Sequence, residues 1–328
     1  MADLKVWFLD VGHGDCAYME LPNGARMMID CGCGEDHWPS LLLKYHKITR
    51  VENPTPYSTE YSKYGLDKLV ISHPHGDHLT DIESIHDEIG FQWLVGNYSG
   101  FIDNIKSEEI DFRKRGQTAA SKFVQVVKRY TGKYDESRDF VAQAAPICSV
   151  RASRFLNYEK GMNLNDLSWF VSFEIGGQKV LFTGDMTSAG VKKIIDSERA
   201  EEFKSFVKGT TILKIPHHGR DNGCSQELFD AFGVQPLLCV ASDESLNEKN
   251  ETSNIPWYTA RTSDQQVMMD GRLQNPKVLT TRKHKDIFLQ ISDTGIIQVI
   301  SNCFADKKSR ILEELAVKEQ LLKALLGR

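Results

Sequence analysis

The chain has 328 residues, of which 41% are hydrophobic, and its formal net charge is −5 at pH 7. This length can bury one large core or two smaller ones. No apolar run approaches the length that crosses a bilayer, and the net negative charge argues against a broadly basic nucleic-acid-binding surface. The start of the sequence lacks the layout of a secretory signal, and the seven cysteines, an odd number, do not resemble a disulfide framework. We therefore expect a cytoplasmic protein with reduced thiols.

The first part of the chain is predicted to begin with strands and then to alternate between helices and strands. Residues 4–9, 16–21 and 25–29 are predicted to be three successive strands, and the turn Pro22-Asn23-Gly24 joins the last two. The elements that follow are a helix over 38–47, a buried strand over 66–72, an amphipathic helix over 79–89 and a strand over 91–95.

The pattern loosens between residues 96 and 163, where only a helix over 117–130 is clearly predicted, so we expect an inserted cap or lid there. Further on, the predicted elements are strands over 167–174 and 179–183, a helix over 188–207, a strand over 211–215, a helix over 226–232, strands over 236–241, 287–291 and 296–300, and a charged helix over 307–326. The expected organisation is a first half of the fold over 1–95, the cap over 96–163, the second half over 164–304 and a C-terminal helix over 305–328. Two β-rich halves with helices outside would fit a four-layer αββα sandwich.

The run His73-Pro74-His75-Gly76-Asp77-His78 follows the apolar stretch Leu69-Val70-Ile71. Imidazole together with carboxylate suits Zn²⁺, Mn²⁺ or Fe²⁺, whereas Ca²⁺ and Mg²⁺ sites are nearly all oxygen. The proline keeps the residue before it extended and the glycine lets the loop fold back tightly, so the side chains can converge. One short loop can therefore supply two metal ions, and the run predicts a metal-dependent hydrolase.

Four other polar groups also stand at the ends of predicted strands, where loops carry function. They are Asp30 before Cys31-Gly32, Asp185 after Gly184, the pair His217-His218 before Gly219, and the glycine-rich loop Asp10-Val11-Gly12-His13-Gly14-Asp15. An aspartate beside a glycine is also a common turn, and the glycine-rich loop could be a tight turn and nothing more. An adjacent histidine pair at a strand end is less common, and it favours a functional role.

In this order and at these strand ends, the motifs resemble the metallo-β-lactamase superfamily. More narrowly, they resemble the metallohydrolase domain of the ComEC DNA-uptake proteins and their soluble relatives. The segments that carry the resemblance are Asp10–Asp15, Met28–Gly32, Ser72–His78, Asn165–Ser168, Leu181–Asp185 and Leu213–Gly219. The resemblance implies the αββα sandwich of that superfamily and a site for two divalent metal ions.

The resemblance also implies which residues hold the metals. The implied ligands are His73 and His75 for the first ion, Asp77 and His78 for the second, Asp185 as the bridge, His218, and His217 as a ligand or a substrate contact. Asp30 resembles the carboxylate that orients a ligand histidine. Two residues depart from the pattern, because His13 stands where glutamine is usual and Asn165 where the superfamily has a third histidine for the first metal. The first site is then short of a strong ligand, so Mn²⁺ would rival Zn²⁺.

Two divalent ions can share a hydroxide that acts as the nucleophile, and Asp77 could orient it as well as bind metal. His13, His217 or Asn165 could donate a hydrogen bond to the substrate, and either histidine could pass a proton to the leaving oxygen. The resemblance implies a phosphodiester substrate, with DNA or RNA as the leading candidate. A small phosphodiester, as in phosphorylcholine esterases, or a nucleotide is the alternative.

Basic and aromatic residues of the expected cap could line a channel for a single strand. They are Phe112, Arg113, Lys114, Arg115, Phe123, Lys128, Arg129 and Tyr130. A solvated helix face with ordinary core aromatics is the simpler explanation of these residues.

A different class of function is a non-catalytic, metal-stabilised scaffold in a multi-protein complex. An apolar stripe on the C-terminal helix could pack against a second copy, a partner encoded in the same operon, or the protein's own domain. The stripe consists of Ile311, Leu312, Leu315, Leu321, Leu322, Leu325 and Leu326.

Overall fold

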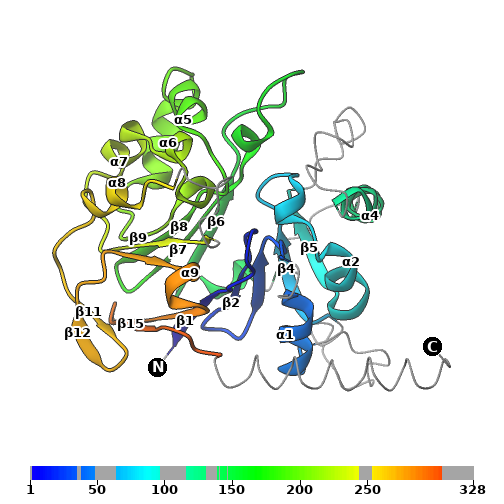
Figure 1. Cartoon of the computed structure of the whole chain (residues 1–328), viewed down its shortest axis with the longest axis horizontal. Coiled ribbons are helices and arrows are strands. Elements are labelled where there is room, and N and C mark those ends of the chain that lie inside the picture. The colour runs from blue at the N-terminus through cyan, green and yellow to red at the C-terminus, as the bar shows by residue number, and fades with distance from the viewer. Residues whose placement is uncertain are drawn as a thin grey trace.

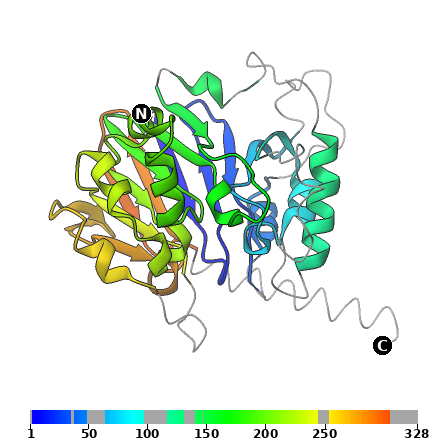
Figure 2. The same ribbon diagram turned by 90° about the horizontal axis from the view of Figure 1, so that it is seen from above.

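The computed structural model describes residues 2–34, 38–48, 64–96, 116–130, 139, 141–145, 147–243 and 253–304. Two β-sheets pack face to face in the middle of the molecule, and helices lie against the outer side of each sheet (Figure 1). The view from above shows the same succession of helices, sheet, sheet and helices (Figure 2). The predicted four-layer αββα sandwich is confirmed.

The first sheet has nine strands in the order β12-β11-β15-β14-β1-β2-β3-β4-β5. Strands β1 to β3 form an antiparallel meander, and β3, β4 and β5 then run parallel. The bounds are β1 (Asp3–Phe8), β2 (Ala17–Glu20), β3 (Arg26–Ile29), β4 (Leu66–Val70), β5 (Phe91–Val95), β11 (Val267–Met269), β12 (Arg272–Gln274), β14 (Ile287–Ser292) and β15 (Ile297–Ile300).

The second sheet has six strands in the order β13-β10-β9-β8-β7-β6. Strands β8, β9, β10 and β13 are parallel, so their carboxyl ends lie at the same edge. The bounds are β6 (Ser149–Ser153), β7 (Phe170–Ile175), β8 (Gln178–Phe182), β9 (Ile212–Lys214), β10 (Leu238–Ala241) and β13 (Val278–Thr280).

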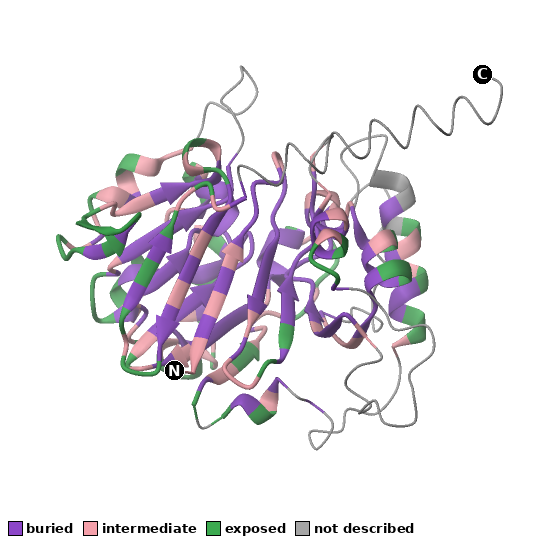
Figure 3. Cartoon of the chain, turned by 90° about the horizontal axis from the view of Figure 1, so that it is seen from below, coloured by how far each residue is buried: buried purple, intermediate pink, exposed green. Residues whose placement is uncertain are grey.

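The core lies in three layers, one between the sheets and one under the helices on each outer side. The strands are largely buried, whereas exposed residues lie mostly on helices and loops (Figure 3). Strand β1 alternates between half-buried and buried residues, the pattern of a strand with one face in a core. Between the sheets, Phe8 of β1 stacks on Phe182 of β8 with ring centroids 5.7 Å apart.

The helices are α1 (Pro39–Tyr45), α2 (Ile82–Ser84) with a π-helical continuation over Ile85–Ile89, α4 (Gly116–Arg129), α5 (Ser188–Ile195), α6 (Ala200–Val207), α7 (Gln226–Phe232), α8 (Ile255–Thr259) and α9 (Thr281–His284). Local sequence explains several of their ends. The Ser225 hydroxyl accepts a hydrogen bond from the amide of Leu228 at the start of α7, and Gly233 ends that helix with a left-handed φ of 68°. Among the described helices, none is both long enough and apolar enough to span a membrane.

The predicted helix over 188–207 is two helices, α5 and α6. The Ser197 hydroxyl donates to the carbonyl of Ile194 at 2.7 Å and accepts from the amide of Arg199 at 3.1 Å. A side chain that takes over backbone hydrogen bonds in this way competes with the helix, so the chain turns between the two segments.

Parts of the segment 96–163, expected to be an inserted cap, belong to the sandwich itself. Strand β6 pairs with β7 at the edge of the second sheet. Helix α4 packs beside α2 in the outer layer, where Lys122 forms an ion pair with Asp87 at 2.9 Å and the Tyr130 hydroxyl donates to the carbonyl of Phe91 at 2.8 Å. The C-terminal helix predicted over 305–328 lies outside the described residues.

Truncating Phe8 to alanine removes a fully buried ring from between the sheets. We expect the free energy of unfolding to fall by about 3–5 kcal/mol, measured by urea denaturation followed by circular dichroism. The matched control is Leu273→Ala on β12, because 62% of the Leu273 surface is exposed. That substitution should cost about 0.5 kcal/mol or less. Equal losses in both variants would contradict this description of the core.

Candidate metal centre

The carboxyl ends of parallel strands from both sheets meet at one edge of the sandwich. In the first sheet, β3 ends just before Asp30 and β4 just before the loop that carries His73. In the second sheet, β8, β9 and β10 end before Asp185, His217 and Ser242 respectively. Polar side chains that are far apart in the sequence are therefore brought into one space between the sheets.

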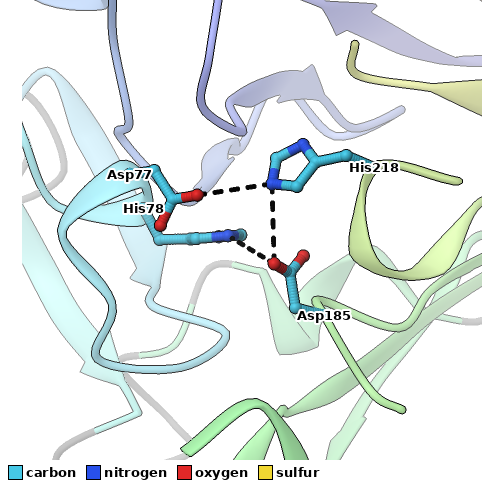
Figure 4. Close-up of side chains that lie close together, drawn as sticks. All are labelled: Asp77, His78, Asp185 and His218. Atoms are coloured by element: carbon cyan, nitrogen blue, oxygen red, sulfur yellow. Dashed lines mark ion pairs between the residues drawn. The ribbon is translucent and has the colours of Figure 1, made fainter. Parts of the chain in front are cut away.

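Four of these side chains form a compact cluster, and their potential ligand atoms all lie within 4.8 Å of one another. The residues are Asp77, His78, Asp185 and His218, and they point toward one another (Figure 4). Oδ2 of Asp185 lies 3.4 Å from Nε2 of His78 and 3.5 Å from Nε2 of His218. Nε2 of His218 also lies 3.5 Å from Oδ2 of Asp77. Two imidazoles and two carboxylates in this arrangement are a donor set suited to Zn²⁺ or Mn²⁺.

Hydrogen bonds behind the cluster fix how its two imidazoles are turned. Nδ1 of His78 lies 2.8 Å from Oδ2 of Asp30, and Nδ1 of His218 lies 2.9 Å from the carbonyl oxygen of Ser242. The Asp30 carboxylate is held in turn by the amide and hydroxyl of Ser72, at 2.7 and 2.6 Å. A proton on each Nδ1 leaves the lone pair of Nε2 free for a metal.

Buried atoms without partners support the same assignment. Within the described part of the chain, Nε2 of His78, Nε2 of His218 and Oδ1 of Asp185 are buried and form no hydrogen bond. Buried polar atoms are rarely left in this state, because each costs free energy unless something binds it. The residues present therefore fit a divalent metal ion.

A second group of side chains surrounds the same Asp185 carboxylate. Nε2 of His73 lies 3.9 Å from Oδ2 of Asp185, and Nε2 of His217 lies 3.8 Å from that oxygen. Nδ1 of His75 is 2.9 Å from Nε2 of His73, and Nδ2 of Asn165 is 3.4 Å from Nε2 of His217. Asp185 thus stands between two groups of potential ligands. Asn165 faces His217, the histidine of the second group that follows a strand of the second sheet.

His13 lies at the more open side of the compact cluster. Nε2 of His13 is 3.5 Å from Oδ2 of Asp77, and the His13 ring stacks on that of His218 with centroids 5.6 Å apart. Its side chain is 14% exposed, whereas that of His78 is fully buried. His13 therefore reaches the cluster from the side on which solvent has access.

The charges in the cluster shift the pKa values in opposite directions. Burial alone would raise the pKa of Asp77 and Asp185, but the neighbouring imidazoles outweigh it and hold both pKa values well below the ordinary range. Burial opposes the protonation of His78 and His218, yet the carboxylates around them raise the pKa of His78 well above its usual value and that of His218 to about 10.

The histidines of the second group behave differently. Burial lowers the pKa of His73, His75 and His217, and repulsion from neighbouring imidazoles acts in the same direction. The nearby carboxylates oppose this shift but do not outweigh it. These three rings are therefore neutral near pH 7, which is the form that binds metal.

A buried ion pair under the site joins the two halves of the fold. Nζ of Lys214 on β9 lies 2.5 Å from Oδ2 of Asp15, the last residue of the glycine-rich loop that carries His13. The other carboxylate oxygen of Asp15 accepts from the hydroxyl of Ser242 at 3.0 Å. This pair is not among the predicted site residues. The one signal of it in the sequence is a lysine inside the apolar strand predicted over 211–215.

The backbone is unusual at the same loops. Asp30, His217 and His218 have φ values of 58°, 48° and 54°, in the left-handed region that side chains other than glycine rarely adopt. Each such residue costs on the order of 1–3 kcal/mol and persists only where its surroundings impose it. Gly32 is needed for a different reason, because a Cβ at this position would overlap the carbonyl oxygen of Asp77.

The structure brings together every candidate site residue from the sequence analysis. These are His13, Asp30, His73, His75, Asp77, His78, Asn165, Asp185, His217 and His218.

The basic and aromatic residues expected to line a channel do not join this site where they are described. Phe123 belongs to α4 and its side chain is fully buried in the core, and the ring of Tyr130 stacks on that of Phe91 with centroids 4.7 Å apart. Lys128 and Arg129 are exposed on α4 in the outer layer. Residues 112–115 lie outside the described part of the chain. The described basic residues therefore lie on the solvated face of a helix, and the described aromatic residues pack into the protein's own core.

Comparison with known proteins finds one family whose sequence model matches part of the chain. Residues 9–117 match the sequence model of the Metallo-beta-lactamase superfamily, and this span contains Asp30 and the whole loop from His73 to His78. Residues 9–117 are therefore similar to the metallo-β-lactamase superfamily, a class of metal-dependent hydrolases.

Solved structures that superimpose on this chain share little sequence with it. YhfI from Bacillus subtilis, a metallo-beta-lactamase fold protein, is 10% identical over 91% of this chain and 100% of its own, with a TM-score of 0.42. The long form of RNase Z from yeast is 11% identical over 75% of this chain and 37% of its own, with a TM-score of 0.36. No curated protein matches this chain. These likenesses carry no inference about activity.

Replacing Gly32 by alanine tests how closely the loops at the site are packed. The new Cβ would push against the carbonyl of Asp77, so we expect the metal-binding loop to move and the affinity for Zn²⁺ to fall at least about tenfold, although no ligand is removed. Titration calorimetry measures this affinity. Gly24→Ala is the control, because a Cβ at Gly24 would meet nothing within 4 Å, although its φ of 83° makes the alanine locally strained. Unchanged affinity in Gly32→Ala would show that the loop can yield.

Metal binding should release protons. The raised pKa values of His78 and His218 keep both rings protonated at pH 7 in the metal-free protein, and each must lose a proton to bind a metal. We expect about two protons to be released for each Zn²⁺ bound at the compact cluster, and the affinity to rise with pH. Calorimetry in two buffers of different ionisation enthalpy counts these protons. A binding heat that does not depend on the buffer would refute the expectation.

Proposed function

We propose that the protein is a metal-dependent phosphodiesterase that cleaves DNA or RNA. The observation that carries the proposal is the convergence on Asp185 of two groups of potential ligands, one from each end of the His73–His78 loop. Each group is joined by a histidine from the turn that follows β9. Paired metal sites that share a carboxylate suit the displacement of a phosphate ester, because both the attacking and the leaving oxygen are stabilised.

The chain's own residues would hold two metal ions. Asp77, His78 and His218 would bind one ion, His73, His75 and His217 would bind the other, and Asp185 would bridge them. When bound, such ions lower the pKa of water toward neutrality and neutralise charge on the phosphoryl oxygens. Zn²⁺ suits the imidazole-rich set best, and Mn²⁺ is the second choice because an amide, Asn165, stands where another imidazole could complete the set.

Other side chains at the site would act on the substrate. Asn165 is buried and its Oδ1 has no hydrogen-bond partner among the described residues, so its amide is available to a substrate or a ligand. His13 lies at the open side beside Asp77, where it can donate a proton to a leaving oxygen. Asp77 can orient the attacking oxygen as well as bind metal.

The ComEC-like sequence motifs support a nucleic-acid substrate over a small phosphodiester. The carboxylates and histidines supply the hydrolytic chemistry for either, so substrate choice depends on residues around the cluster. The protein would act without the membrane channel of ComEC proteins, and DNA uptake is not part of the proposal.

A double variant, Asp77→Ala with His78→Ala, tests the enzyme directly. Purified protein is assayed with Mn²⁺ or Zn²⁺ on bis-p-nitrophenyl phosphate and on labelled DNA and RNA. We expect turnover to fall by on the order of 10³-fold or more, because the several kcal/mol that a metal supplies to the transition state are lost.

The chain offers a matched control for this variant. His86 and Asp87 are another adjacent histidine and aspartate, with Nδ1 and Oδ1 2.5 Å apart, and they lie on the outer helix layer. His86→Ala with Asp87→Ala should keep wild-type turnover. Wild-type protein that binds metal but cleaves no phosphodiester would favour a metal-stabilised scaffold, and cleavage of the small ester alone would favour a small substrate.

A further inference from the structure

Arg220 is the first residue after the turn that carries His217 and His218. Its backbone is firmly held, because its amide donates to the carbonyl of His217 at 2.9 Å and its carbonyl accepts from the amide of Gly223 at 2.9 Å. It also forms an isolated antiparallel bridge with Ser253. The side chain of Arg220 therefore starts from a fixed point at the rim of the metal centre.

The charge of this arginine has no counter-ion among the described residues. Arg220 is half-buried, yet its guanidinium takes part in no hydrogen bond or ion pair within the described part of the chain. Other arginines are paired, since Arg282 lies 3.3 Å from Asp243 and Arg199 lies 2.7 Å from Glu202. A half-buried guanidinium loses some of its hydration, so an anion that binds it would be stabilised.

The Arg220 charge also acts on the site itself. The charge of Arg220 repels positive charge on His217, whereas the Asp185 carboxylate attracts it more strongly. The guanidinium is thus within electrostatic reach of a potential metal ligand. The positive charge of the Arg220 guanidinium repels any metal ion held at the nearby centre, unless an anion binds between them. A phosphate that contacts both would relieve this repulsion.

We propose that Arg220 binds the phosphate next to the one that is cleaved, and so selects substrates that carry more than one phosphate. The inference rests on the proposed phosphodiesterase function and specifies its substrate as a polynucleotide. Arginine suits the task because its planar fork donates two parallel hydrogen bonds to phosphate oxygens. A small diester with a single charge would have no group to place there.

The test compares two dinucleotides with the same scissile bond, TpT and its 5′-phosphorylated form pTpT. Wild-type metal-loaded protein should prefer pTpT, mainly through KM. In Arg220→Gln this preference should fall by about 10- to 100-fold, the usual range for losing a charge-assisted hydrogen bond. Turnover of bis-p-nitrophenyl phosphate should fall by less than turnover of pTpT, because that ester has no second phosphate. Arg220→Lys should restore part of the preference.

The control is Arg272→Ala, because Arg272 lies exposed on the edge strand β12. Equal losses on TpT, pTpT and the small ester would overturn the proposal, since Arg220 would then serve the scissile phosphate or the fold. No loss on any substrate would also overturn it.

Calorimetric affinities of wild type and Arg220→Gln for pTpT and TpT separate this inference from the proposed function. If the wild type turns over no phosphodiester, the proposed function fails, whereas a difference between pTpT and TpT that disappears in Arg220→Gln still supports an anion site at Arg220. Equal affinities in wild type would overturn the inference whatever the activity.

Discussion

One carboxylate oxygen organises the whole site. Oδ2 of Asp185 has four imidazole nitrogens around it, from His78 at 3.4 Å, His218 at 3.5 Å, His217 at 3.8 Å and His73 at 3.9 Å. Two of these rings come from the first sheet and two from the second. The two sheets must therefore pack in one relative position for the site to exist, and the core between them serves the chemistry as well as stability.

The two groups of ligands around this oxygen are not equivalent. The compact cluster has two carboxylates and two imidazoles whose Nδ1 atoms are held by Asp30 and Ser242. The second group relies on neutral imidazoles and has an amide, Asn165, beside it. A site with more negative charge and oriented rings binds a divalent ion more strongly. The asymmetry predicted from Asn165 thus has a physical basis in the surroundings of each group.

The sequence predicts the residues of the site better than their supports. The loop from His73 to His78, Asp185 and the pair His217-His218 each follow an apolar run, so their positions at strand ends could be predicted. The partners of Asp15 could not be predicted, because Lys214 is 199 positions away and only the packing of the sheets brings the two together.

Some strands and one helix break could not be predicted from the sequence either. Strand β12 consists of three exposed residues and shows no alternation, and β6 lies in a segment whose polarity resembles that of a loop. The break between α5 and α6 depends on the Ser197 hydroxyl, which no periodicity reveals. Short edge strands and side-chain hydrogen bonds are decided by tertiary contacts, and these leave little trace in local sequence.

The ion pair between Lys214 and Asp15 has a consequence for how the chain can be divided. Lys214 is 2% exposed and Asp15 is 7% exposed, and each comes from a different half of the sandwich. If the halves were separated, each would carry a charged group that is buried in the intact protein and has no counter-ion, a defect that typically costs about 3–5 kcal/mol. Neither half is thus a self-sufficient unit. A chimera that joins one half of this protein to the other half of a distant relative would need an opposite charge at the equivalent buried position of the relative.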